Sequence, residues 1–235
     1  MLRLLQWLNR HEAALRLILF ITGLSPAATL LGQSLLGELG FNPFNTLMNT
    51  TGQWAIGFLL ASLAVTPLRR WLSALCRLLR ASGGKRLSDW NFLFKARRMI
   101  GLFAFFYASV HLAVYLHLEV NWQLVWTLDD LAERPFLIPG LAGWLILLML
   151  AVTSPTAVQR AMKRHWRRLH RLSYPLVVIA IWHIWWAAKT ENSLHYSYIV
   201  LAFAFLMHRL LASRVRRFRR RDDLGMAVDR PQRPL

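Results

Sequence analysis

Apolar residues along this chain gather in six blocks that are separated by polar segments. The blocks cover about residues 14–34, 51–68, 99–118, 137–153, 172–188 and 196–212. At about 1.5 Å of rise per residue, a helix formed by each block is long enough, or nearly so, to cross a hydrocarbon layer of about 30 Å. The pattern therefore predicts an all-α integral membrane bundle of about six transmembrane helices.

The composition agrees with this prediction. Of the 235 residues 56% are hydrophobic and the mean hydropathy is +0.35, yet the formal net charge is +18. A soluble domain of this size would usually be less apolar and would spread its charges over the surface. Here the charges lie between the apolar blocks, as expected for a protein of the bilayer.

Lysine and arginine are distributed unequally over the two predicted sides of the membrane. They are concentrated in the N-terminal segment, in residues 69–98, in residues 160–171 and in the tail after residue 213, whereas the opposite side has only Arg134 and Lys189. The acidic residues of that opposite side are Glu38, Glu119, Asp129, Asp130, Glu133 and Glu191. Because basic loops stay on the cytoplasmic side, both termini are expected to be cytoplasmic in a multi-pass protein of the bacterial inner membrane. Topology and anionic lipid headgroups explain the positive charge, so nucleic acid is not an expected partner.

Several classes of site are excluded by what the chain lacks. Its single cysteine, Cys76, allows neither an intramolecular disulfide nor covalent haem attachment through a CxxCH motif. No glycine-rich fingerprint joins a strand to a helix, so no nucleotide-binding domain of its own is expected. We expect a membrane domain over residues 1–212 and a basic, disordered cytoplasmic tail over residues 213–235.

Two histidines stand out because ionisable groups inside a bilayer are costly and usually functional. The third and fifth blocks run in the same direction, and His111 and His183 lie at equivalent depths in them. Both are expected roughly 16–18 Å from the cytoplasmic boundary. Two imidazoles at one depth on parallel helices can bind one haem iron from opposite faces. The alternative is a pair of polar interhelical hydrogen bonds.

Three further histidines give a weaker indication of haem binding. His170 begins the fifth block, thirteen residues before His183, and is a possible second ligand or alternate ligand of haem iron. An ideal helix places these two about 140° apart, although Pro175 between them could kink the helix. His208 is a weak candidate partner for His170. His117 faces away from His111 and is expected to have a structural or interfacial role.

Three functions are compatible with these residues before any family is considered. The first is an electron-transfer subunit that holds haem b without covalent attachment. The second is a ferric reductase or oxidase-like subunit, which usually carries a fused flavin and nicotinamide domain. The third is a transporter or proton channel that uses His111 and His183 as a relay, and this function predicts no bound chromophore.

The ordered set of motifs resembles a known family, the MsrQ (YedZ) family, within the ferric-reductase-like transmembrane group. The similarity covers roughly residues 14–212. It is carried by TTGQWA at 50–55, LAVTPLRR at 63–70, ARRMIGL at 96–102, VHLAVY at 110–115, ERPFLIPGLAGWLIL at 133–147, WRRLHRLSY at 166–174 and HIWWAAK at 183–189. Single motifs are weak, but their order is specific.

The resemblance implies a role in the repair of oxidised envelope proteins. It places His111, His170 and His183 on the three haem-associated histidines of the family. It further implies that electrons enter from the quinone pool or a cytoplasmic flavin reductase, cross the membrane through haem, and pass to MsrP, a periplasmic molybdopterin methionine sulfoxide reductase. FMN is a further cofactor associated with the family. The chain would then be an electron-transfer subunit that is not catalytic by itself.

Overall fold

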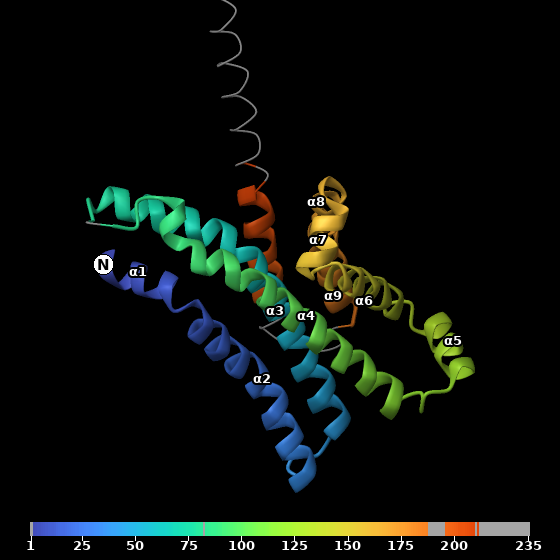
Figure 1. Cartoon of the computed structure of the whole chain (residues 1–235). Coiled ribbons are helices and arrows are strands. Elements are labelled where there is room, and N and C mark those ends of the chain that lie inside the picture. The colour runs from blue at the N-terminus through green and yellow to red at the C-terminus, as the bar shows by residue number, and fades with distance from the viewer. Residues whose placement is uncertain (1, 82, 188–195, 210, 212–235) are drawn as a thin grey trace, which may run out of the picture.

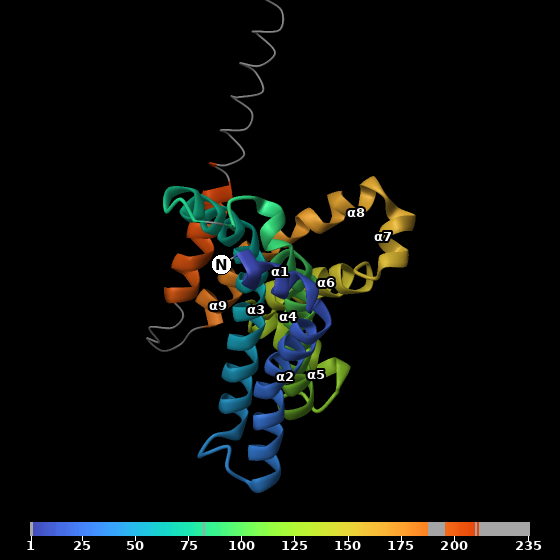
Figure 2. The same ribbon diagram turned by 60° about the vertical axis from the view of Figure 1, so that its left-hand side comes forward.

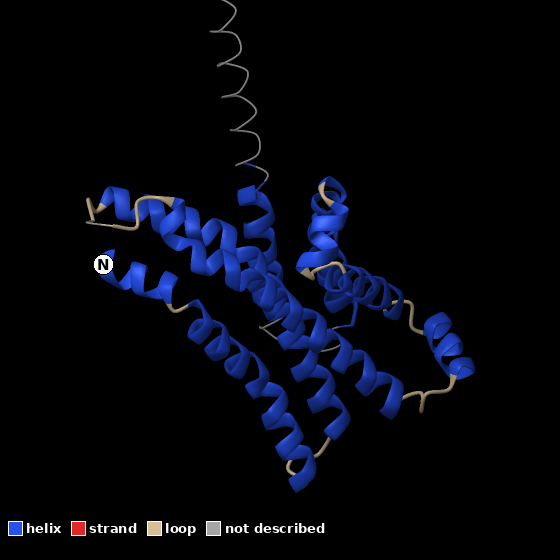
Figure 3. Ribbon diagram, viewed as in Figure 1, coloured by secondary structure: helices blue, strands red, loops and turns tan. Residues whose placement is uncertain are grey.

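The computed structural model describes residues 2–81, 83–187, 196–209 and 211, and this part of the chain contains helices and no strand (Figure 3). The predicted all-α class is therefore confirmed. The elements are α1 (Leu2–Arg10), α2 (Glu12–Leu36), α3 (Pro43–Leu78), η1 (Leu87–Trp90), α4 (Asn91–Leu118), α5 (Leu124–Glu133), α6 (Leu137–Val152), α7 (Thr156–Met162), α8 (Arg164–Leu169), η2 (His170–Leu172), α9 (Ser173–Ala187) and a last helix over 196–209. The predicted tail, residues 213–235, lies outside the described residues.

The predicted number of six membrane spans is only partly supported. Within the described residues, three helical segments are long and apolar enough to cross a membrane: Ala13–Leu36, Pro43–Leu78 and Leu87–Leu118. α5 and α6 reach this length and hydropathy only as a pair, and they are bent by 120° relative to each other. α6 has 16 residues because Pro155 follows shortly after Val152 and opposes continuation of the helix. The structure thus supports three spans, or four with the bent pair.

The core of the bundle lies where α3, α4, α6 and α9 meet. α3 and α4 run antiparallel along each other, α2 lies beside α4, and α6 packs against α4 and α9 (Figures 1 and 2). The side chains of Ala104, Leu176 and Val177 are fully buried where these helices meet. This packing holds α4 and α9, which carry the two histidines singled out above, on either side of one core.

A tyrosine of α4 binds the backbone of α2 next to Pro26. Pro26 lies inside this helix, where proline removes a backbone donor and opposes the regular hydrogen-bond ladder. The hydroxyl of Tyr107 on α4 accepts a hydrogen bond from the amide of Ala27 (3.0 Å) and donates one to the carbonyl of Gly23 (2.8 Å). Tyr107 is fully buried. One side chain thus satisfies two backbone groups of α2 and fixes this helix to α4.

The basic segments come together at one end of the bundle. Figure 1 shows α1, the α3–α4 connection, α7 and α8 in its upper part, together with the end of the last helix. The α2–α3 connection and α5 lie in the lower part. The structure therefore groups the segments as the charge pattern predicts, and the assignment of the basic end to the cytoplasm stays a prediction.

At the opposite end an ion-pair network joins α5 to the end of α4. Arg134 pairs with Glu119 at 2.7 Å and with Asp130 at 3.0 Å, and Tyr115 donates a hydrogen bond to Asp130 at 2.6 Å. The hydrogen bond to Glu119 raises the pKa of Arg134 and keeps it charged. Asp130 therefore joins α5 to α4.

Candidate functional site

His111 and His183 face each other in the middle of the bundle. Their ring centroids are 6.4 Å apart and the ring planes are almost perpendicular, at 84°. One ring comes from α4 and the other from α9, so the structure brings together the two residues that the sequence placed at one depth. Both side chains lie in the partly buried interior of the protein.

The ring of His111 is oriented by α3. Its Nδ1 lies 3.1 Å from the carbonyl oxygen of Met48 and 3.3 Å from the hydroxyl of Thr51. A carbonyl oxygen only accepts, so the proton must be on Nδ1. Gly52 lies under the ring, because a Cβ at this position would be 3.2 Å from Cε1 of His111. The imidazole therefore lies directly on the α3 backbone in one tautomer.

His183 has an equivalent environment on α6. Its Nδ1 lies 2.8 Å from the carbonyl oxygen of Phe136, which again requires the proton on Nδ1. A Cβ at Gly140 would be only 2.8 Å from Cε1 of His183 and 3.0 Å from its Nδ1. Real Cβ atoms do not approach so closely, so a larger residue at position 140 would force the ring to move.

These contacts make both histidines suitable as metal ligands. With the proton on Nδ1, the Nε2 atoms carry the lone pairs, and neither Nε2 makes a hydrogen bond to another described residue. Histidines that bind metals usually donate their other N–H to a carbonyl or carboxylate, which fixes the tautomer and increases the basicity of the ligand. Two metal–nitrogen bonds of about 2.0–2.1 Å, plus the distance from each nitrogen to its ring centre, would place the centroids roughly 6 Å apart. The observed spacing of 6.4 Å fits two imidazole ligands of one metal.

His170 lies apart from this pair. It is in η2, and the thirteen residues to His183 correspond to roughly 20 Å along a helix. Its Nε2 lies 3.2 Å from the hydroxyl of Thr153, and its ring packs on that of Trp166 at 4.1 Å. Partial burial and the nearby charge of Arg97 lower the pKa of His170, so the neutral ring is favoured. The structure therefore brings together two of the three candidate residues.

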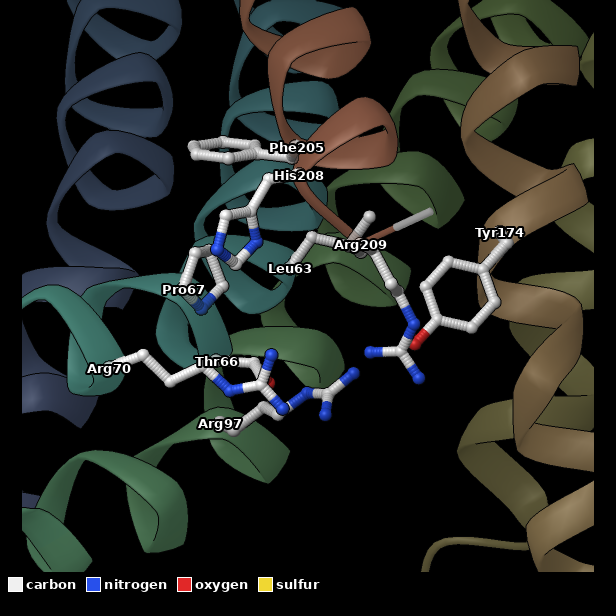
Figure 4. Close-up of a pocket in the computed structure, with 9 residues that line it drawn as sticks. All are labelled: Leu63, Thr66, Pro67, Arg70, Arg97, Tyr174, Phe205, His208 and Arg209. Atoms are coloured by element: carbon white, nitrogen blue, oxygen red, sulfur yellow. The ribbon is translucent and has the colours of Figure 1, made fainter. Parts of the chain in front are cut away.

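The other histidines singled out in the sequence have distinct surroundings. His208 contacts Trp71 edge-on, with ring centroids 5.3 Å apart, and lines a pocket with arginine side chains (Figure 4). His117 accepts a hydrogen bond from the indole of Trp122 at 3.2 Å, which agrees with the structural role expected for it.

Several residues of the site were not identified from the sequence. The carbonyl groups of Met48 and Phe136 could not be found there, because every residue carries such a group. Gly52 and Gly140 did leave a signal, since each is an isolated glycine inside an apolar helix, and such glycines usually have a packing reason. What they pack against becomes visible only when α3 meets α4 and α6 meets α9.

Comparison with known proteins gives a consistent result. Residues 51–181 match the family model of the ferric reductase like transmembrane component. Proteins named "Protein-methionine-sulfoxide reductase heme-binding subunit MsrQ" are similar over much of the chain. The one from Xanthomonas euvesicatoria pv. vesicatoria (strain 85-10) is 40% identical over 153 residues, which are 65% of this chain and 63% of that protein.

Two further MsrQ proteins match longer segments. The protein from Xanthomonas campestris pv. campestris (strain 8004) is 36% identical over 179 residues, 75% of each chain. The protein from Herminiimonas arsenicoxydans is 38% identical over 170 residues, 72% of this chain and 71% of its own length. The chain thus belongs to the membrane proteins of the ferric reductase like transmembrane family and, among these, to the MsrQ family.

Proposed function

We propose that this protein holds haem b between His111 and His183 and transfers electrons across the bacterial inner membrane to a periplasmic methionine sulfoxide reductase. One observation carries the proposal: two imidazoles from different helices lie 6.4 Å apart, with both Nδ1 atoms at backbone carbonyls. The names of the similar proteins support the same cofactor and the same reductase.

The protein's own groups would prepare this site before any cofactor binds. The carbonyls of Met48 and Phe136 hold the two rings in the tautomer that exposes Nε2. Gly52 and Gly140 allow the rings to lie against the helix backbones, which limits their rotation. A bound haem would supply a one-electron redox centre, and the protein would supply its ligands, its position and its low-dielectric surroundings.

The direction of electron transfer follows from the proposed topology. Electrons would enter at the basic end, from quinol or a cytoplasmic flavin reductase, and leave at the end of α5 to the molybdopterin subunit MsrP. Asp130 is occupied by Arg134 and Tyr115, so Asp129 and Glu133 are the exposed carboxylates of α5 that a periplasmic partner could contact. Charge complementarity of this kind mainly affects association rate and specificity.

His170 and FMN belong to the same proposal as additional elements. His170 would serve as a ligand of a separate haem near the basic end, about 20 Å from the first site along the helix. FMN is implied by the family, and the fluorescence of cofactors released by acid from the purified protein tests for it.

The experiment is a comparison of visible spectra. The wild type and the variants His111→Ala, His183→Ala and His117→Ala are purified from haem-replete cells, and spectra are recorded in oxidised and dithionite-reduced form with pyridine haemochrome quantification. We expect a low-spin b-type spectrum in the wild type and in His117→Ala, whose histidine is on the same helix but outside the pair. His111→Ala and His183→Ala should lose haem or become high spin.

A second measurement tests the redox partner. Reduced protein in liposomes is mixed with MsrP and methionine sulfoxide, and oxidation of the haem is followed. A colourless wild type would reject the electron-transfer function and favour a histidine relay for protons. A coloured protein that MsrP does not oxidise would keep the haem site and reject this partner.

A further inference from the structure

One side of α5 is exposed and apolar. All ten residues of this helix are at least partly exposed. Three of its largest apolar side chains are mostly exposed: Leu124 by 72%, Val125 by 67% and Leu128 by 58%. Figure 1 shows α5 at the edge of the bundle, beyond the end of α4. Neighbouring exposed apolar side chains on one helix usually mark a contact with a partner or a membrane.

The exposed surface of α5 is divided into an apolar strip and an acidic strip. At about 100° per residue, Leu124 and Leu128 lie about 40° apart on the helix, and Val125 lies about 60° beyond Leu128. Asp129 and Glu133 are also exposed and occupy the adjoining sector, on the far side of Val125. A helix with an apolar side next to a charged side has the pattern of a helix that lies in the plane of a membrane surface.

The rotation of α5 about its axis is fixed by contacts on its inner side. Asp130 accepts a hydrogen bond from Tyr115 of α4 at 2.6 Å and pairs with Arg134 at 3.0 Å. Arg134 also pairs with Glu119, just after the end of α4, at 2.7 Å. Asp130 lies about 160° round the helix from Leu128. The contacts that hold Asp130 against α4 therefore turn Leu128 away from the bundle.

The place of α5 in the chain favours lipid as the neighbour of its apolar strip. Residues 119–123 alone separate α5 from the membrane-spanning segment Leu87–Leu118. With ten residues α5 is about 15 Å long, too short to cross a hydrocarbon core of about 30 Å, and it is bent by 120° relative to α6. Trp122 and Trp126 are 61% and 50% exposed. Tryptophan is enriched where hydrocarbon meets water.

We propose that α5 lies in the lipid–water interface at the end of the bundle that carries Glu119 and Asp130. Leu124, Val125 and Leu128 contact the acyl chains, while Asp129 and Glu133 face water. This arrangement depends neither on haem nor on the redox partner, so its test can fail separately from that of the proposed function.

The test measures the surroundings of single spin labels on the full chain in vesicles of phosphatidylcholine and phosphatidylglycerol. Leu128→Cys and its matched control Asp129→Cys are made in a Cys76→Ser background and labelled with a nitroxide. Relaxation of the label by oxygen, which concentrates in lipid, is compared with relaxation by a nickel chelate, which stays in water. We expect the oxygen-to-nickel ratio to be several-fold higher at position 128 than at position 129. Leu124→Cys and Glu133→Cys are a second pair with the same expectation, in case the first pair does not fold.

Three results would overturn the proposal. High access of the nickel chelate to position 128 would show that the apolar strip faces water. Low access of both reagents would show that protein covers it, for example a second copy of this chain. Access of the chelate that falls only when the periplasmic reductase is added would identify the strip as a binding surface for that partner.

Discussion

At the scale of single residues, the candidate haem site depends on groups other than its two histidines. Gly140 allows His183 to approach α6, and Thr51 and Met48 orient His111 from α3. Such neighbours of a metal ligand often contribute strongly to affinity, because they fix the ligand before the metal binds. Two substitutions test these contributions separately: one fills the space beside His183, and the other removes a hydrogen bond to His111.

The first substitution is Gly140→Ala. The new Cβ would be 2.8 Å from Cε1 of His183, so the ring must turn away from its position. We expect haem affinity to fall by roughly 10-fold or more, as is typical for loss of support around a metal ligand. Haem titration of the apoprotein measures this. Gly57→Ala is the control, since a Cβ there has nothing within 4 Å; equal losses in both variants would contradict the proposed contact.

The second substitution is Thr51→Val. It keeps the shape of the side chain but removes the hydroxyl that lies 3.3 Å from Nδ1 of His111, while the carbonyl of Met48 remains. A weaker hydrogen bond to Nδ1–H makes the imidazole a less basic ligand, which favours ferrous over ferric iron. Haem should therefore stay bound with a higher midpoint potential in a redox titration. An unchanged potential would show that Thr51 does not act on the ring.

At the scale of elements, a buried side chain of α4 joins this helix to the backbone of α2. The hydroxyl of Tyr107 accepts a hydrogen bond from the Ala27 amide and donates one to the Gly23 carbonyl, next to Pro26. Near α5, Arg134 likewise joins two segments, because it pairs with Glu119 after the end of α4 and with Asp130 of α5. In both cases polar groups join residues of two different segments of the chain.

We predict that Tyr107→Phe destabilises the protein. The substitution leaves the Ala27 amide and the Gly23 carbonyl without their shared partner in a buried position, and an unsatisfied buried group costs about 1–3 kcal/mol. Denaturation in mild detergent should show a lower Tm. Tyr198→Phe serves as the control, because Tyr198 is only partly buried. If both variants unfolded at the wild-type temperature, the bridge would have no energetic importance.

At the scale of the whole molecule, the bundle has a basic end and an end with carboxylates. This asymmetry would orient the protein in the membrane and present α5 to the periplasm.

Orientation can be measured by cysteine labelling. In a Cys76→Ser background, Lys85→Cys and Asp129→Cys place single thiols in the α3–α4 connection and on exposed α5. A membrane-impermeant maleimide should label position 129 in intact spheroplasts, and position 85 only after lysis. Labelling of position 85 before lysis would reverse the topology and the direction of electron flow.

Much of this protein could be predicted from the order of its residues. Apolar blocks, basic loops and the depth of two histidines are local properties, because helix rise and charge depend on neighbouring residues only. They were sufficient for the all-α membrane class and for the pair of His111 and His183. The number of spans could not be predicted in this way, because the α5–α6 bend and the end of α6 near Pro155 change the length of helix that an apolar block forms.

The remaining features depend on tertiary structure because they join residues far apart in the chain. Gly52 meets His111 and Gly140 meets His183 only after α3 packs on α4 and α6 on α9. Arginines of α3, α4 and the last helix likewise line one pocket. The sequence alone determined which side chains are costly inside a membrane, and only the packing of the helices decided which backbone groups and charges surround them.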